Sequence, residues 1–230
     1  MTENMRIAVE IGFNIIYLIV VWAITIMMTW RLNHVVAENR KMASLFRWAF
    51  VLLALGDTGH VGFRIVAYIL GGLEKNGLLV GVGALATAIT VTFFYVILLF
   101  IWRLRFNKKF GVFEYVILFS VPVRMIVMCL PQNDWGNSVP PAFWGIFRNL
   151  FLVILGVGVL FLYLRDAKIA GDRLFNNIGI CIFLSFLFYT PVILFARTFP
   201  LIGMLMIPKT IMYLVIQVLA YRTLWVSNKA

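Results

Sequence analysis

Seven apolar stretches of about twenty residues each take up most of this chain of 230 residues. A helix of that length crosses the hydrocarbon core of a bilayer. With 63% hydrophobic and only 13% charged residues, the chain cannot cover a water-soluble globule with polar surface. The sequence therefore predicts an all-α integral membrane protein built as a seven-helix bundle. We predict the spans near residues 11–30, 48–73, 78–102, 113–130, 143–164, 175–195 and 201–225.

The segments between these stretches are short, so we expect residues 1–230 to form one transmembrane domain. The N-terminal segment shows no small-residue cleavage site after a short apolar core, and we expect it to remain uncleaved. Two cysteines and two histidines are too few for a convincing structural zinc site or a disulfide framework. The sequence predicts no metal.

Basic residues between the spans are distributed unevenly. Arg6, Lys75 and Arg197 fall on one side, and thirteen fall on the other: Arg31, Arg40, Lys41, Arg47, Arg103, Arg105, Lys108, Lys109, Arg165, Lys168, Arg173, Arg222 and Lys229. The positive-inside rule then places the N-terminus outside and the C-terminus in the cytoplasm of a multi-pass cell-membrane protein. The net charge of +11 comes mostly from this rim, which we expect to lie against anionic lipid headgroups rather than nucleic acid.

Six ionisable residues lie inside the predicted spans, and they are the strongest functional signal: Asp57, His60, Arg64, Arg124, Arg148 and Lys209. A charge at the centre of a membrane helix costs about 2.5–3.5 kcal/mol on insertion scales, so such residues usually face a cavity or one another. Counted from the outer ends of four spans, all six fall in the outer half of the bilayer. We therefore predict a shared cavity open to the outside.

The second span carries three of these residues on one face. With Tyr68, the residues Asp57, His60 and Arg64 lie within about 60° of one another on a helix, which makes a polar stripe. Gly56 points away from this stripe and leaves the other face free for close packing. Small residues recur at helix-packing spacings elsewhere, and tryptophans stand at the span ends, where we interpret them as interfacial anchors.

The predicted layer holds four basic residues against one carboxylate, Asp57. Arg124 and Arg148 can snorkel to the outer interface, Lys209 can lose its proton, and Glu10, Glu74 and Asp134 can compensate in part. An anion bound by the arginines is the remedy we favour, because their planar donor fork suits carboxylates and phosphates. We predict that Asp57, His60, Arg64, Tyr68, Arg124, Arg148 and Lys209 bind a small anionic ligand or lipid headgroup.

Several alternatives remain open at this stage. The buried charges can pair merely to hold the bundle together, and Asp57 and His60 can serve as the acid–base pair of a lipid-modifying enzyme. We expect binding or transport rather than catalysis. The short C-terminal tail carries no signalling domain, so a receptor would need a protein partner, whereas a transporter would not.

One further alternative comes from a resemblance. Seven spans, an outside N-terminus, Lys209 within the seventh span and Tyr189 beside Pro191 in the sixth resemble the microbial rhodopsins. That resemblance implies retinal bound to Lys209 as a Schiff base, with Asp57 as its counterion. The third span departs from the family pattern, offering Thr87 and Thr90 in place of an arginine and carboxylates, and Leu205 stands where the family has an acid. We predict no cofactor, with retinal as the alternative.

Overall fold

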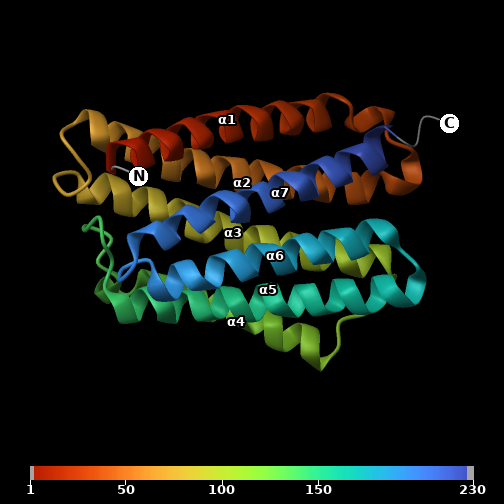
Figure 1. The fold of residues 1–230 in the computed structure, drawn as a ribbon. Coiled ribbons are helices and arrows are strands. Elements are labelled where there is room, and N and C mark those ends of the chain that lie inside the picture. The colour runs from red at the N-terminus through yellow and green to blue at the C-terminus, as the bar shows by residue number, and fades with distance from the viewer. Residues whose placement is uncertain (1–2, 227–230) are drawn as a thin grey trace.

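The computed structural model describes residues 3–226, and every regular element in that range is helical (Figure 1). Seven long α-helices follow one another: α1 Glu3–Trp30, α2 Ala37–Ile69, α3 Gly77–Arg105, α4 Val112–Cys129, α5 Ala142–Ala170, α6 Arg173–Phe195 and α7 Met206–Tyr221. Short 3-10 helices at Leu32–His34, Pro131–Asn133 and Pro200–Leu205 and a π-helical turn at Arg222–Val226 complete the fold. All seven helical segments are long and apolar enough to cross a membrane, so this is a multi-pass membrane protein.

Helix bounds differ from the predicted spans chiefly at α2. This helix begins at Ala37 rather than near Trp48, because the charged residues after Ala37 favour helix although they end the apolar run. It ends at Ile69, where Gly71 and Gly72 adopt the left-handed φ angles of 101° and 113° that glycine tolerates best. Among the basic residues used to orient the chain, Lys229 and the side chain of Arg6 lie outside the described part.

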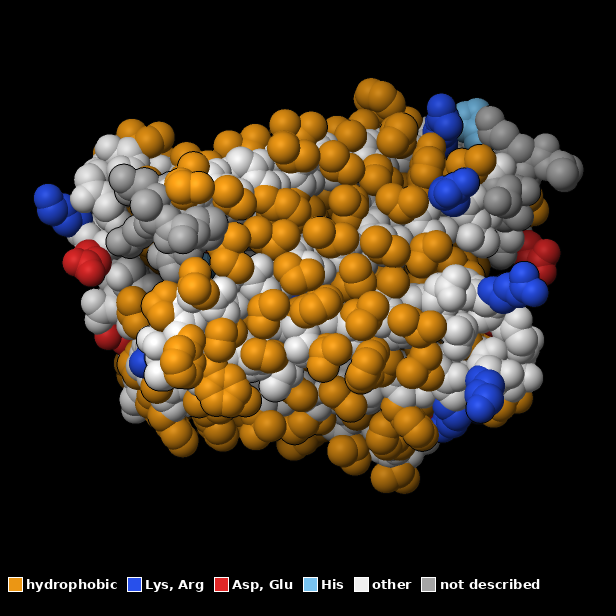
Figure 2. Space-filling model, in the orientation of Figure 1, with side chains coloured by type: hydrophobic (Ala, Val, Ile, Leu, Met, Phe, Trp, Pro, Cys, Tyr) orange, Lys and Arg blue, Asp and Glu red, His pale blue; other side chains and the backbone are white. Residues whose placement is uncertain are grey.

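The helices form a bundle, and the described chain begins at one end of this bundle and finishes at the other (Figure 1). α2 and α3 make the most extensive helix pair, α7 packs between α6 and α1, and α4 lies at the periphery, mainly against α5. Large side chains fill the centre, among them Phe46, Phe94, Tyr95, Tyr163 and Phe175. An apolar band crosses the middle of the face shown in Figure 2, and the blue basic side chains gather mostly at the end that carries the C-terminus. This distribution suits a bilayer.

Individual glycines, rather than a repeated glycine motif, allow neighbouring segments to approach the helices closely. A Cβ at Gly56 would meet the Thr90 hydroxyl of α3 at 1.8 Å, as the packing interpretation predicts. A Cβ at Gly81 would lie 1.7 Å from the backbone oxygen of Trp135. Gly81 therefore allows the loop that contains Trp135, rather than another helix, to approach α3 closely. A Cβ at Gly62 would meet nothing within 4 Å, so this glycine is not required for close packing.

The anchor interpretation is wrong for two tryptophans. Trp102 and Trp225 are buried inside the bundle, where their indole N–H groups donate to the Asp166 carboxylate at 2.8 Å and the Met28 carbonyl at 3.0 Å. Trp30 and Trp48 are exposed, as anchors require.

Candidate ligand-binding pocket

A pocket of about 870 Å³ lies between the helices at the end of the bundle where α1 begins. All seven long helices contribute to its lining, together with the segments that precede α5 and follow α6. The six ionisable residues found inside the predicted spans all line it. The structure therefore brings these six residues together around one space.

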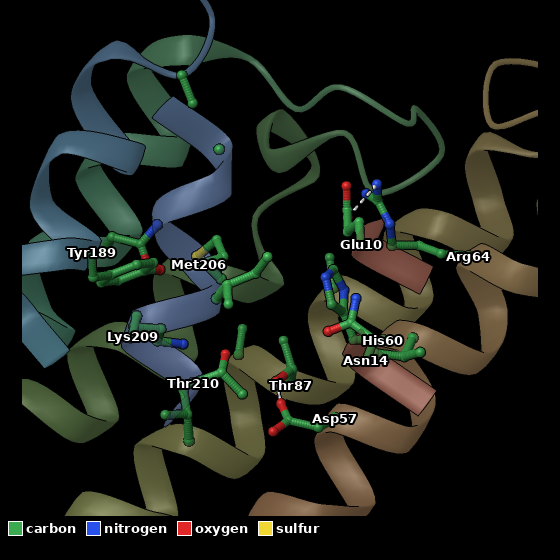
Figure 3. Close-up of a pocket in the computed structure, with 18 of the residues that line it drawn as sticks. Glu10, Asn14, Asp57, His60, Arg64, Thr87, Tyr189, Met206, Lys209 and Thr210 are labelled. Carbon is green, nitrogen blue, oxygen red and sulfur yellow. Dashed lines mark hydrogen bonds and ion pairs between the residues drawn. The ribbon is translucent and has the colours of Figure 1, made fainter. Parts of the chain in front are cut away.

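Helices α1 and α2 supply the carboxylates of the pocket. The Asp57 carboxylate accepts hydrogen bonds from the Tyr17 hydroxyl at 2.8 Å and from the Thr87 hydroxyl at 3.1 Å, so three helices converge on it. His60, one turn further along, keeps its Nδ1 atom buried without a hydrogen-bond partner among the described residues. Nearer the mouth, Arg64 pairs with Glu10 of α1 at 3.3 Å (Figure 3).

Lys209 reaches the pocket from α7. Its Nζ atom lies 5.0 Å from the ring centroids of both Tyr189 and Tyr213, a distance suited to cation–π attraction. Within the described part of the chain this ammonium forms no hydrogen bond or ion pair, and Asp57 stands across the pocket from it (Figure 3). Pro208 precedes Lys209 in the first turn of α7, where a missing N–H is tolerated.

Arg124 and Arg148 are enclosed within the bundle rather than snorkelling, which was one of the remedies that the sequence left open. Their side chains are enclosed, with residue exposures of 1% and 8%. Nη1 of Arg124 donates to the backbone carbonyl of Arg148 at 2.7 Å, and Nη1 of Arg148 donates to Oδ1 of Asn133 at 3.3 Å. The Arg148 guanidinium also lies 4.2 Å from the Trp135 ring centroid. Neither arginine pairs with a carboxylate among the described residues.

Several predicted contributors lie elsewhere. Tyr68 lines a much smaller neighbouring pocket, together with Glu10 and Arg64, rather than the main one. Of the three acids proposed as compensation, Glu10 reaches Arg64, while Glu74 and Asp134 do not line the pocket. The stripe predicted on α2 is thus correct for three of its four members as pocket residues.

Sequence reasoning missed polar neutral residues that shape the site. Tyr17 and Asn14 lie in an apolar stretch of α1, where the nearest charged residue is Glu10, one turn before Asn14, and Asn133 ends the short 3-10 helix in the loop between α4 and α5. The amide of Asn133 donates to the carbonyls of Val127 and Leu130 at 2.6 and 3.0 Å, which secures the end of α4. Only the density of turn residues in that loop could have suggested an ordered role.

Aromatic side chains lie where the pocket meets the hydrophobic core. The Tyr95 and Tyr213 hydroxyls lie 3.2 Å apart, and Phe94 and Phe186 pack against these rings with centroid separations of 5.4–5.5 Å. All four side chains are buried. We call this layer of Phe94, Tyr95, Phe186 and Tyr213 the aromatic floor. Of these four residues, Phe186 and Tyr213 line the pocket, and all four belong to the hydrophobic core of the bundle.

The lining carries more positive than negative charge. Five basic residues, Arg64, Arg124, Arg148, Arg197 and Lys209, face two carboxylates, Glu10 and Asp57. No cluster of three or more His, Cys, Asp or Glu side chains suited to a metal occurs in the described range 3–226. Asp57 and His60 share no hydrogen bond there, so they do not form a preassembled acid–base pair.

No protein-family model, curated protein or solved structure matches this chain.

Proposed function

We propose that this protein binds a small anion bearing a carboxylate or phosphate group in the pocket, as a receptor or transporter of the cell membrane. The observation that carries the proposal is the excess of basic side chains in one enclosed space. A buried cation without a counterion is costly, because desolvation is not offset by attraction to an opposite charge. A bound anion supplies the missing charge.

The geometry supports the same ligand class. Arg124 retains a buried Nε atom without a hydrogen-bond partner among the described residues, and Lys209 has its whole ammonium available. Donors of this kind make the strong, charge-assisted hydrogen bonds that hold carboxylates and phosphates. Tyr189 is already engaged with Asn149 at 3.1 Å, which leaves the cations as the main donors.

The orientation belongs to the proposal as well. Basic side chains are concentrated at the end of the bundle opposite the pocket, and the positive-inside rule places that end in the cytoplasm. The pocket then opens to the outside, and the aromatic floor lies between it and the cytoplasmic half. A closed floor favours binding in the state described, and transport would require the floor to rearrange.

Purified protein in detergent tests the proposal through thermal unfolding. A panel of small carboxylates, inorganic phosphate, soluble phosphate esters and short-chain anionic phospholipids should contain members that raise Tm in a concentration-dependent way. Lys209→Met should remove this shift, whereas Lys108→Met, the same exchange on the exposed opposite end, should preserve it. The soluble and lipid members separate a free anion from a lipid headgroup. If no member of the panel shifts Tm, the proposal is wrong.

Flux measurements distinguish a transporter from a receptor. Proteoliposomes that accumulate a labelled anion identified by the Tm shift indicate a transporter, whereas binding without flux indicates a receptor. Two further experiments test the alternatives. Reconstitution with retinal gives a visible absorption band only if Lys209 forms a pigment. Conversion of a lipid by the wild-type protein, with loss of this activity in Asp57→Asn, would indicate an enzyme.

A further inference from the structure

The charged groups of the pocket are sorted by side. Basic residues come from the later part of the chain: Arg124 of α4, Arg148 of α5, Arg197 after α6 and Lys209 of α7. Both carboxylates come from α1 and α2, and Arg64, the basic residue on this side, is paired with Glu10. The pocket is therefore polarised across its width.

The α1–α2 side also gathers hydrogen-bond acceptors. Asp57 has two bonds, one on each oxygen, and a carboxylate has about four acceptor positions, so about two remain. His60 keeps Nδ1 unpartnered, and the side chain of Asn14 makes no hydrogen bond with the described residues. In Figure 3 these three residues lie together on the side opposite Lys209. We call Asn14, Asp57 and His60 the acceptor side.

We infer that the ligand is an anion that also carries an ammonium group, such as an amino acid with an acidic side chain or a phosphate ester of an amino alcohol. This inference rests on the proposed function and specifies it. The anionic group binds at Lys209 and Arg124. The ammonium group donates to Asp57, with His60 Nδ1 and the Asn14 carbonyl as the other acceptors, an arrangement that uses all three donors of a primary ammonium.

The charge count is consistent with such a ligand. Taken with Arg64, the two carboxylates leave one negative charge on the α1–α2 side, while the four remaining basic residues leave four positive charges opposite. A simple anion would neutralise part of the basic side, but it would leave Asp57 on the α1–α2 side without a cation in direct contact. A ligand with a net negative charge and one ammonium group satisfies both. The volume of about 870 Å³ is that of small-molecule sites, which run to about 1,000 Å³.

The test compares pairs of probes that differ only in the amino group: glutamate with glutarate, aspartate with succinate, and phosphoethanolamine with ethyl phosphate. In wild-type protein at neutral pH, we expect the amino member of at least one pair to bind about tenfold more tightly or better, as judged from the concentration dependence of Tm. Asp57→Asn should abolish that preference while retaining the affinity for the partner lacking the amine. Lys209→Met should weaken both members.

The outcomes separate the two proposals. Stabilisation by anions with no preference for the amino member in any pair overturns this inference and leaves the proposed function standing. An equal loss of affinity for both members of a pair in Asp57→Asn also overturns this inference, because the carboxylate would then act on the whole pocket rather than on the amine. No stabilisation by any probe contradicts both proposals. The wild-type comparison alone decides the matter if Asp57→Asn fails to fold, which gel filtration in detergent reports.

Discussion

Arg124 is the residue whose burial is hardest to explain by packing alone. Its side chain is 1% exposed, it has no carboxylate partner in the described chain, and one of its donors binds a helix carbonyl that belongs to Arg148. A buried charge without a partner of opposite charge tends to destabilise a protein, because the desolvation cost of several kcal/mol is not offset. A residue retained against that tendency is better explained by ligand binding than by support of the fold.

Arg124→Met should therefore separate binding from stability. We expect Tm without ligand to change by no more than a few degrees, because removal of the buried charge offsets loss of the hydrogen bond to the Arg148 carbonyl. Anion affinity should fall by about tenfold or more, because charge-assisted hydrogen bonds are lost. Thermal unfolding with and without the stabilising anion measures both. Arg105→Met, which removes an ion pair to Asp172 at the opposite end, is the control and should leave the anion response intact. A large fall in Tm without ligand would indicate that Arg124 is structural.

At the scale of elements, the loop between α4 and α5 is built into the bundle rather than merely covering it. Asn133 is fully buried, and its amide secures the end of α4 while its oxygen accepts from Arg148. On the other side, the Trp135 backbone lies against α3 at Gly81. The loop thus links α3, α4 and α5 beside the arginines.

Asn133→Ala should destabilise the protein. The substitution removes three side-chain hydrogen bonds, two to the carbonyls of Val127 and Leu130 and one from the Arg148 guanidinium, and each such bond contributes about 0.5–1.5 kcal/mol. Denaturant unfolding in detergent measures the loss. Asn137→Ala, in the exposed part of the same loop, provides the comparison and should have a much smaller effect. Equal effects from the two substitutions would argue against a structural role for the buried amide.

Gly81→Ala tests the contact between this loop and α3. The added methyl group would lie 1.7 Å from a backbone oxygen, which cannot move as a side chain can, so the loop or α3 must shift. Overpacking of this kind costs about 1–3 kcal/mol. We expect a lower Tm and weaker anion binding. Gly12→Ala, where a methyl group meets nothing within 4 Å, should leave both unchanged, and a harmless Gly81→Ala would contradict the close contact.

For the whole molecule, hydropathy alone was enough to predict seven membrane-spanning helices, because an apolar stretch in lipid has few alternatives to a helix. It also singled out six residues that line one pocket, since Asp57, His60, Arg64, Arg124, Arg148 and Lys209 are conspicuous in apolar surroundings. Their pairing was not predictable. Whether Arg148 reaches water or Asn133 depends on how a loop folds between helices, and the residues that decide this are uncharged and far apart in sequence.

The distribution of basic residues along the whole chain predicts an N-terminus outside and a C-terminus in the cytoplasm. In cells expressing a variant in which alanine replaces Cys129 and Cys181, a single cysteine at the exposed position Glu74 should react with a membrane-impermeant maleimide. A cysteine at Lys108, exposed at the other end, should react only after permeabilisation. The reverse pattern would place the pocket on the cytoplasmic side and would contradict the proposed orientation.

The aromatic floor has an electrical consequence. A pocket filled with water or ligand conducts far better than hydrocarbon, so most of the transmembrane voltage falls across the low-dielectric layer formed by the floor and the core beyond it. A charge that enters from the mouth and stops at Lys209 crosses little of this field. A charge moved through the floor crosses most of it, which corresponds to about 2.3 kcal/mol per elementary charge at 100 mV. Occupancy of the pocket should therefore respond weakly to membrane potential, whereas passage of a net charge through the floor should respond strongly.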